Sequence, residues 1–303
     1  MHLPRQGEVD GLVSVIMANL NKDKYIERAI ESVLGQDYPE VELVVIDGGS
    51  TDRSIDIIRR YESDIAYWIS EKDKGQADAV NKGIRRSTGP IVGWLHSDDE
   101  LFPSGLSSVM DSVARFPLAG LHYGVGAKIN RQSEIIKWVR SGVADGDRIN
   151  KYPGLFQPST YVSRRAIEEV GYLDEDLDLW MDWDLYMRIK KKYSVQFVDA
   201  PVGRWRKYAE TKSEISKSSI WISKSELAKV ARKNGSVWNR NNIIFQATNA
   251  LNLAYEVTGF RLFARCNSWV FWLANMLFGA KGHAIDYNRL PNEDPLGDDH
   301  QKF

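Results

Sequence analysis

The chain has 303 residues, 43% hydrophobic and 27% charged, which is typical of a soluble globular protein with one large domain and an appendage, or with two domains. Its 40 Lys and Arg residues balance 41 Asp and Glu residues, which argues against a general nucleic-acid binder. A single cysteine, Cys266, excludes an internal disulfide and fits a reducing compartment. We expect neither a secretory signal, since residues 1–11 are polar, nor a membrane span, since no apolar run reaches roughly 18 residues.

The N-terminal third alternates short apolar runs with amphipathic segments. Between the first two runs, one helix face would carry the apolar residues Ile26, Ala29, Ile30, Val33 and Leu34. Strands separated by single helices indicate βαβ units and a parallel, doubly wound sheet. We predict strands at 13–17, 43–46, 65–69 and 91–95, and helices at 23–35, from 50 or 51 to about 61, and from 75 to about 84.

The pattern changes after about residue 117, where short strands with tight turns predict that the sheet becomes mixed. Residues 213 to about 280 then read as almost wholly helical. Between these points we predict strands at 121–123, 127–130, 135–139 and 195–198, and helices at 163–171 and 181–192.

The segment 91–99, IVGWLHSDD, ends an apolar run in two adjacent carboxylates, Asp98 and Asp99. At the carboxyl end of a buried parallel strand they would lie in the crevice where open α/β sheets bind ligands. Hard divalent cations prefer oxygen ligands and often share them with substrate phosphates. The segment therefore suggests a metal that holds a phosphorylated substrate, although the same residues are ordinary in a solvated turn.

Four polar clusters follow the four predicted strands, at 18–21, 47–52, 71–76 and 96–99. Each could be only a loop, but their joint position at one sheet edge favours a ligand site. The glycine-rich GxGxxG and GxxxxGK[ST] phosphate loops are absent from the sequence. We therefore expect a metal and side chains to neutralise any bound phosphates.

Two segments carry a family resemblance: VSVIMANLNKDKYIERAIESVLGQDYPEVELVVIDGGSTDRS and EKDKGQADAVNKGIRRSTGPIVGWLHSDD. They resemble family 2 glycosyltransferases with the GT-A fold, although the proline of the usual Pro-Thr-Tyr-Asn turn is missing. The resemblance covers about residues 12–212. It implies a Rossmann-like α/β domain at 1–212 with a mixed, mainly parallel sheet flanked by helices, made of a nucleotide half (about 12–117) and an acceptor half (118–212). A helical C-terminal extension, 213–303, would follow.

The resemblance implies a donor pocket at the ends of the first three strands. Asp47 would hydrogen-bond the nucleotide base, Asp73 and Lys74 would contact the nucleotide and its phosphates, and a basic loop would close over the diphosphate. A solvated basic loop remains an alternative for the last group. The donor-binding candidates are Ala18, Asn21, Asp47, Asp73, Lys74, Asp78, Arg204, Arg206 and Lys212.

By the same resemblance, Asp98 matches the last acid of the DxD motif that binds Mn²⁺ or Mg²⁺. His96 takes the place of the first acid. It could approach the ribose or a water on the metal, or simply form hydrogen bonds at the strand end. Asp99 would assist the metal or hold the loop. The metal candidates are thus His96, Asp98 and Asp99.

In the acceptor half, the residues Gln157, Pro158 and Ser159 resemble the floor of the family's acceptor site, and Trp180 would line it. The segment MDWDL resembles the motif that supplies the catalytic base, which would be Asp182. An acidic residue at a helix start is also favourable for electrostatic reasons alone.

The C-terminal region contains a dense aromatic and aliphatic stretch at 260–278, with Arg261 and Arg265 near its beginning and Lys281 just after its end. Trp and basic residues beside an apolar face suit a membrane interface. Packing against the catalytic domain or in a homo-oligomer is an equal alternative.

The expected function is therefore an inverting, metal-assisted transfer of a sugar from a nucleotide-sugar, most commonly a UDP-sugar in this family, to a glycan or lipid-linked acceptor in bacterial cell-surface polysaccharide or glycolipid synthesis. The expected location is the cytoplasm, with a peripheral position on the inner face of the cell membrane as an alternative. A sugar-phosphate nucleotidyltransferase is disfavoured because ANLNKDKY lacks a glycine- and arginine-rich loop. A non-catalytic relic of the fold is favoured by His96 and Met181 but opposed by Asp98 and Asp182.

Overall fold

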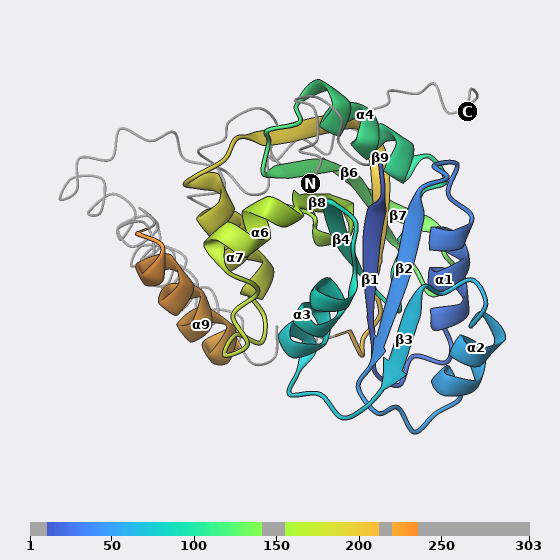
Figure 1. Ribbon diagram of the computed structural model, residues 1–303. Coiled ribbons are helices and arrows are strands. Elements are labelled where there is room, and N and C mark those ends of the chain that lie inside the picture. The colour runs from blue at the N-terminus through green and yellow to red at the C-terminus, as the bar shows by residue number, and fades with distance from the viewer. Residues whose placement is uncertain (1–10, 141–154, 212–219, 236–303) are drawn as a thin grey trace, which may run out of the picture. The chain divides into compact units, whose positions relative to one another are not determined.

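The computed structural model describes residues 11–140, 155–211 and 220–235. Within them, a nine-stranded sheet has the order β3-β2-β1-β4-β8-β6-β9-β5, with β7 paired to β6 (Figure 1). Lys212 and the stretch 260–278 lie outside the described residues. The predicted mixed, mainly parallel sheet flanked by helices is confirmed.

The N-terminal half consists of βαβ units whose strands are all parallel, as predicted. Three of its strands, β1, β2 and β4, are buried almost throughout, and a parallel strand covered on both faces gives a continuous apolar run rather than an alternating one. The elements are β1 (Val13–Asn19), α1 (Ile26–Leu34), β2 (Val41–Asp47), α2 (Ser54–Arg60), β3 (Tyr67–Ser70), α3 (Gln76–Arg86) and β4 (Ile91–His96).

In the second half the sheet becomes mixed: β8 is antiparallel to β4 and to β6, whereas β9 is parallel to β6 and antiparallel to β5. The elements are β5 (Glu100–Leu101), α4 (Gly105–Arg115), β6 (Leu121–Ile129), β7 (Ile135–Val139), the 3-10 turn η1 (Gln157–Ser159), β8 (Thr160–Ser163), α6 (Arg164–Val170), α7 (Met181–Lys190), β9 (Val195–Arg206) and α9 (Ile220–Lys233).

Two strand predictions in this half were wrong in extent. The predicted strands 121–123 and 127–130 are one strand, β6, whose apolar run is interrupted by Gly124 and Gly126 because other side chains approach the backbone there. A Cβ on Gly126 would lie 2.1 Å from the Phe156 ring. Strand β9 does not stop at 198. It passes through an irregularity in its pairing near Pro201 and continues to residue 206. Helix α4 was not predicted.

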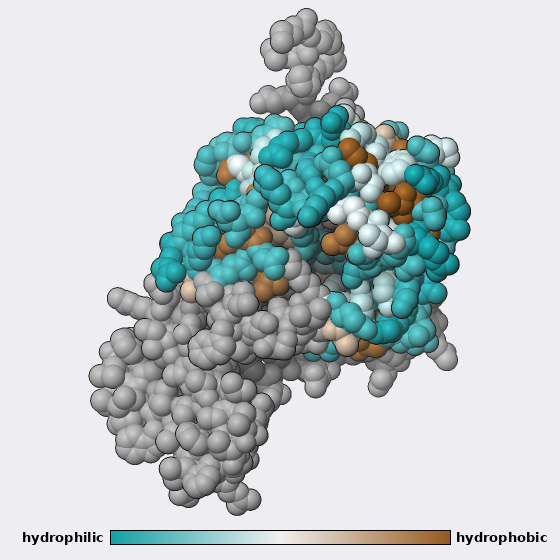
Figure 2. All heavy atoms as spheres, turned by 90° about the horizontal axis from the view of Figure 1, so that it is seen from below, coloured by the Kyte–Doolittle hydropathy of each residue, from teal (hydrophilic) through white to brown (hydrophobic). Residues whose placement is uncertain are grey.

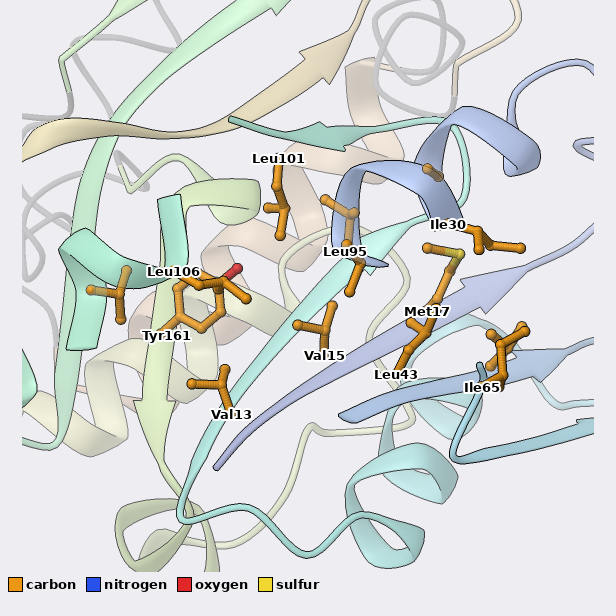
Figure 3. Close-up of a cluster of buried hydrophobic side chains, with 14 of the residues drawn as sticks. Val13, Val15, Met17, Ile30, Leu43, Ile65, Leu95, Leu101, Leu106 and Tyr161 are labelled. Carbon is orange, nitrogen blue, oxygen red and sulfur yellow. The ribbon is translucent and has the colours of Figure 1, made fainter. Parts of the chain in front are cut away.

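The two faces of the sheet are covered by different helices. Side chains at alternate β1 positions, Val13, Val15 and Met17, join a buried cluster with residues of α1, α2 and α4 (Figure 3). On the opposite face α3 lies so close to β1 that a Cβ on Gly83 would be 2.2 Å from Ile16 Cγ2. This packing fixes the carboxyl ends of β1 to β4 at one edge of the sheet.

The described residues up to Asn234 form one compact unit that includes α9. In the described part of the chain, no helix combines the length and the apolarity needed to cross a membrane.

Candidate functional site

The four polar clusters lie at one edge of the sheet, as the topology required. The strand register sets Asp47 opposite both Asn19 and Ser70, and Ala18 opposite His96. Figure 2, seen from below relative to Figure 1, looks onto this edge, where hydrophilic residues predominate among small hydrophobic patches.

Asp47 is completely buried, and the protein itself engages both of its oxygens. Oδ1 accepts hydrogen bonds from the Asn19 amide at 2.6 Å and from the Ser50 hydroxyl, and Oδ2 accepts from the Ser70 hydroxyl at 2.6 Å and from the Gly49 and Ser50 amides at 3.1 and 2.9 Å. Burial raises the pKa of Asp47, but the hydrogen bonds outweigh this effect and hold the pKa below its usual value. Asp47 therefore fixes the turn after β2, with little capacity left for a nucleotide base.

Asp73 lies directly over this turn. A Cβ on Gly48 would be 2.4 Å from Asp73 Oδ2, so the absence of a side chain at residue 48 makes room for the Asp73 carboxylate. Asp73 Oδ1 accepts a hydrogen bond from the Gly75 amide at 3.0 Å, and burial raises the pKa of Asp73. No hydrogen bond to Asp73 Oδ2 is present among the described residues, so this oxygen can accept one from a ligand.

Other donor candidates hold the loops together. Asn21 adopts a positive φ of 53°, and its Oδ1 accepts a hydrogen bond from the Thr51 amide at 2.8 Å. Asp78 is 7% exposed, accepts a hydrogen bond from the Lys74 amide at 3.0 Å and pairs with Lys82 at 3.2 Å. Ala18 is partly exposed and Lys74 is exposed, so both can approach a ligand.

Asp98 is paired with a cation that the sequence analysis had not singled out. Its Oδ2 lies 3.0 Å from Lys22 Nζ and accepts a hydrogen bond from the Tyr208 hydroxyl at 2.5 Å, while Lys22 also donates to Tyr208 at 2.6 Å. Burial raises the pKa of Asp98, but the Lys22 charge and Tyr208 outweigh burial and lower it. The position of Lys22, directly after the 18–21 cluster, was the available sequence signal.

Asp99 is buried beside Asp98. Its Oδ1 accepts the Arg206 backbone amide at 2.8 Å, whereas Oδ2 is buried without a hydrogen-bond partner in the described part of the protein. Burial and the adjacent Asp98 charge raise the pKa of Asp99 well above its usual value. His96 Nδ1 lies 3.0 Å from the Gln76 side-chain amide nitrogen, which agrees with the interpretation of His96 as a hydrogen-bonded strand-end residue.

The chemistry of these groups fits Mg²⁺ or Mn²⁺ when the cation shares its coordination with a diphosphate. The protein offers hard carboxylate oxygens from Asp98 and the unpaired Oδ2 of Asp99. Across the described ranges, no three His, Cys, Asp or Glu side chains are grouped closely enough to hold a metal by themselves. Mg²⁺ commonly binds through one or two carboxylates, with substrate phosphates and waters completing its shell.

The basic residues of β9, for which the resemblance implied a role at the donor site, are engaged by groups of the protein itself. Arg206 is 0% exposed; its guanidinium donates to the carbonyl oxygens of Asp98 at 2.9 Å and Asn130 at 2.7 Å, and it pairs with Glu100. Arg204 also pairs with Glu100, at 3.0 Å. Both arginines thus stabilise the loop that contains Asp98 and Asp99, and we assign them a structural role.

The acceptor elements pack against the strand that leads to Asp98. Ser159 is 0% exposed and bonds Val125 O at 3.2 Å and the Gly203 amide at 3.0 Å, and Pro158 is also buried, so both build the sheet rather than an open floor. Gln157, partly exposed, donates to the Trp94 carbonyl of β4. Trp180, also partly exposed, immediately precedes α7.

Asp182 begins α7. Its Oδ1 accepts the Trp183 amide at 2.7 Å, and burial raises its pKa to about 6. One helical turn later, Tyr186 stacks on Trp94 with ring centroids 5.8 Å apart. Gln157 and α7 thus both contact Trp94. These contacts connect the acceptor elements to β4, the strand that precedes Asp98 and Asp99. A carboxylate with a pKa near 6 at such a place can accept a proton near neutral pH.

The family model described as glycosyl transferase family 2 matches residues 14–167. A poly-beta-1,6-N-acetyl-D-glucosamine synthase of Staphylococcus epidermidis is 26% identical over 196 residues, which cover 59% of this chain and 47% of the synthase. A chondroitin synthase of Escherichia coli is 32% identical over 127 residues, which cover 41% of this chain and 18% of that protein. The chain thus spans less than half the length of either relative.

Solved structures share the fold at low sequence identity. The crystal structure of S. aureus TarS 1-349 in complex with UDP-GlcNAc has a TM-score of 0.55 at 19% identity and covers 68% of this chain and 61% of its own. The mannosyltransferase PcManGT from Pyrobaculum calidifontis, in complex with GDP-Man and Mn²⁺, has a TM-score of 0.55 at 17% identity and covers 88% of this chain and 86% of its own.

Proposed function

Because the chain belongs to glycosyl transferase family 2, we propose that it moves a sugar from a nucleotide-sugar to an acceptor hydroxyl by a single, inverting displacement. The observation that carries this proposal is the carboxylate of Asp182, with a pKa of about 6, at the start of a helix packed against the strand that leads to Asp98. A general base for a hydroxyl needs such a carboxylate near the reacting group.

On the donor side, Asp73 Oδ2 would accept a hydrogen bond from an N–H group of the base, with Ala18 and Asn21 lining the pocket and Lys74 facing the phosphates. We propose UDP as the nucleotide because TarS binds UDP-GlcNAc. GDP is the competing candidate because PcManGT binds GDP-Man. Uracil and guanine both present an N–H donor to a carboxylate, so the Asp73 contact supports either base.

In the transfer itself, Asp182 accepts the proton of the acceptor hydroxyl while the hydroxyl oxygen attacks the anomeric carbon from the face opposite the diphosphate. Asp98 and Asp99 would hold Mn²⁺ or Mg²⁺, which when bound offsets negative charge on the leaving diphosphate. Asp47 and Arg206 keep the loops that carry these groups in place. Burial around Asp182 keeps its proton affinity high enough for it to act as a base.

For the acceptor we propose a growing glycan or a lipid-linked sugar of the cell surface, because the curated relatives include synthases of polysaccharides. A lipid-linked acceptor would be met at the inner face of the cell membrane, with residues 260–278 at the interface or in a homo-oligomer. Vesicle flotation of the full chain, with and without residues 260–278, tests the membrane contact.

The decisive experiment measures nucleotide release from UDP-, GDP- and dTDP-sugars with Mn²⁺, with Mg²⁺ and with EDTA. We expect metal-dependent release from one donor, faster with an acceptor. The absence of both release and metal-dependent nucleotide binding for every donor would instead favour a non-catalytic protein of the same fold.

A further inference from the structure

Helix α9 lies beyond the residues matched by the family model, yet it contacts the segment that carries the proposed base. Figure 1 shows α9 beside α7. Its side chains reach the chain on both sides of Asp182, where their polar contacts are with charged side chains or backbone amides. Because the base must be held in one position to act, these contacts bear directly on the proposed reaction.

Before the base, the contact is made by Glu226. Its carboxylate accepts hydrogen bonds from the backbone amides of Asp178 and Leu179, the latter at 3.1 Å. These amides lie three and four residues before Asp182, in a stretch outside any helix or strand. Hydrogen bonds from backbone amides to a carboxylate are stronger than bonds between neutral groups. Glu226 therefore holds two backbone amides that lie outside any helix or strand.

After the base, the contact is made by Asp184, which is 0% exposed. Its Oδ1 accepts a hydrogen bond from the Asn234 side chain at 2.8 Å, and its Oδ2 lies 3.2 Å from Lys233 Nζ and 2.9 Å from Arg188 Nε. Lys233 also pairs with Asp174 at 2.7 Å. Lys233 therefore links Asp174, at the start of the segment that leads to Asp182, to Asp184 on α7, and Asn234 adds a second bond to Asp184.

The opposite side of the same segment is held by α3. The side chain of Asn81 donates to the Leu173 carbonyl at 2.9 Å and accepts the Leu173 amide at 3.0 Å. Residues 173–184 therefore run between two helices, α3 and α9, with Asp182 near the end of the run. Of these two helices, only α9 contributes a carboxylate whose charge acts on Asp182.

We propose that Glu226 is a positioning residue for the transfer, which sets the place of Asp182 through the Asp178 and Leu179 amides. Beside the larger effect of burial, the negative charge of Glu226 also raises the pKa of Asp182. This inference rests on the proposed role of Asp182. Besides Glu226, the ionisable side chain that faces Asp182 is Tyr186, one helical turn later on α7, and the Trp183 amide faces it as a fixed dipole.

Two variants separate the effects of the hydrogen bonds and of the charge. Glu226→Gln keeps a side-chain oxygen that can accept from the two amides but removes the charge, whereas Glu226→Ala removes both. The matched control is Glu168, an exposed carboxylate on α6, changed to Gln and to Ala. The full chain is used, and thermal unfolding of each variant verifies that it is folded.

In Glu226→Ala we expect hydrogen exchange at the Leu179 amide to quicken by about 10- to 100-fold, as loss of a bond to a charged group implies. We expect kcat to fall by about 10-fold or more with the donor KM unchanged. In Glu226→Gln we expect kcat to be largely retained and the acid limb of the kcat/KM profile to move to lower pH. The Glu168 variants should match the wild type.

Unchanged exchange and unchanged kcat in Glu226→Ala would overturn the inference, as would equal effects in Glu168→Ala. If Glu226→Ala fails to fold, an unshifted pH profile in Glu226→Gln overturns it. Asp182→Asn, assayed in parallel, distinguishes the two proposals. If Asp182→Asn remains active, the proposed base is wrong. If Asp182→Asn is inactive but the Glu226 variants match the wild type in exchange, kcat and pH profile, only the role of Glu226 is wrong.

Discussion

Replacing Arg206 by Met distinguishes a structural role for this residue from the donor-binding role that the family resemblance implied. The guanidinium is completely buried, pairs with Glu100 and donates to three carbonyl oxygens, at 2.7, 2.9 and 3.2 Å. Methionine would remove these hydrogen bonds and would leave Glu100 with the Arg204 guanidinium, 3.0 Å away, and the Ser133 hydroxyl. Breaking a buried ion pair from one side typically costs about 3–5 kcal/mol.

For a protein of this size, such a loss lowers Tm by roughly 5–10 °C. Thermal unfolding followed by circular dichroism measures the loss, and Arg131→Met is the matched control because that arginine forms an exposed pair with Glu210. The double variant Arg206→Met, Glu100→Gln should be more stable than the sum of the single variants predicts, by at least about 1 kcal/mol, because the two side chains are in contact. A variant with wild-type Tm but weakened nucleotide binding would refute the structural role and restore the donor-binding one.

Three further predictions concern the ligands. Asp182→Asn should lower the transfer rate by about 100-fold or more, while nucleotide affinity, measured by calorimetry, stays unchanged. In the wild type, kcat/KM should fall as the pH drops through about 6, because protonation of Asp182 removes the base. Equal activity in Asp182→Asn would exclude this base. Asp73→Asn should weaken nucleotide binding by about 10-fold without a change in Tm, since its Oδ2 has no hydrogen-bond partner in the described residues; unaltered affinity would exclude the contact with the base. Lys22→Met should tighten Mn²⁺ binding to the nucleotide-free protein, followed by electron paramagnetic resonance, because Asp98 loses a cation 3.0 Å away; a constant affinity would show that Lys22 does not compete.

The extent to which the sequence predicts this fold depends on how each strand is covered. Strands β1, β2 and β4 are buried on both faces, so they appear in the sequence as unbroken apolar runs and were found within two residues of their ends. Strand β6 contains two glycines required by side chains packed against it, and β9 passes an irregularity at Pro201. Such breaks look like turns in the sequence because the partner that explains them lies far along the chain.

The grouping of the site could be predicted from topology alone, since polar residues after successive parallel strands must share one edge. The pairing of their side chains could not. Lys22 contacts Asp98 and Tyr208 across separations of 76 and 186 residues, and the buried partner of Arg206 is Glu100, 106 residues away. A single sequence does not show whether a charged residue pairs with a buried partner or remains in solvent.

The structure also divides the charged and polar residues of the family motifs into two groups. Asp47, Asp184 and Arg206 are fully buried and engaged by the protein, so their chemistry maintains the loops in which they lie. Asp73, Asp98 and Asp182 are each partly exposed and stand next to them in sequence or space. The exposed members can react with a ligand because the buried members hold the backbone in place, which leaves few side chains that must rearrange when the ligand binds. Substitutions in the buried group should therefore lower Tm first, and those in the exposed group should change binding or rate while Tm is maintained.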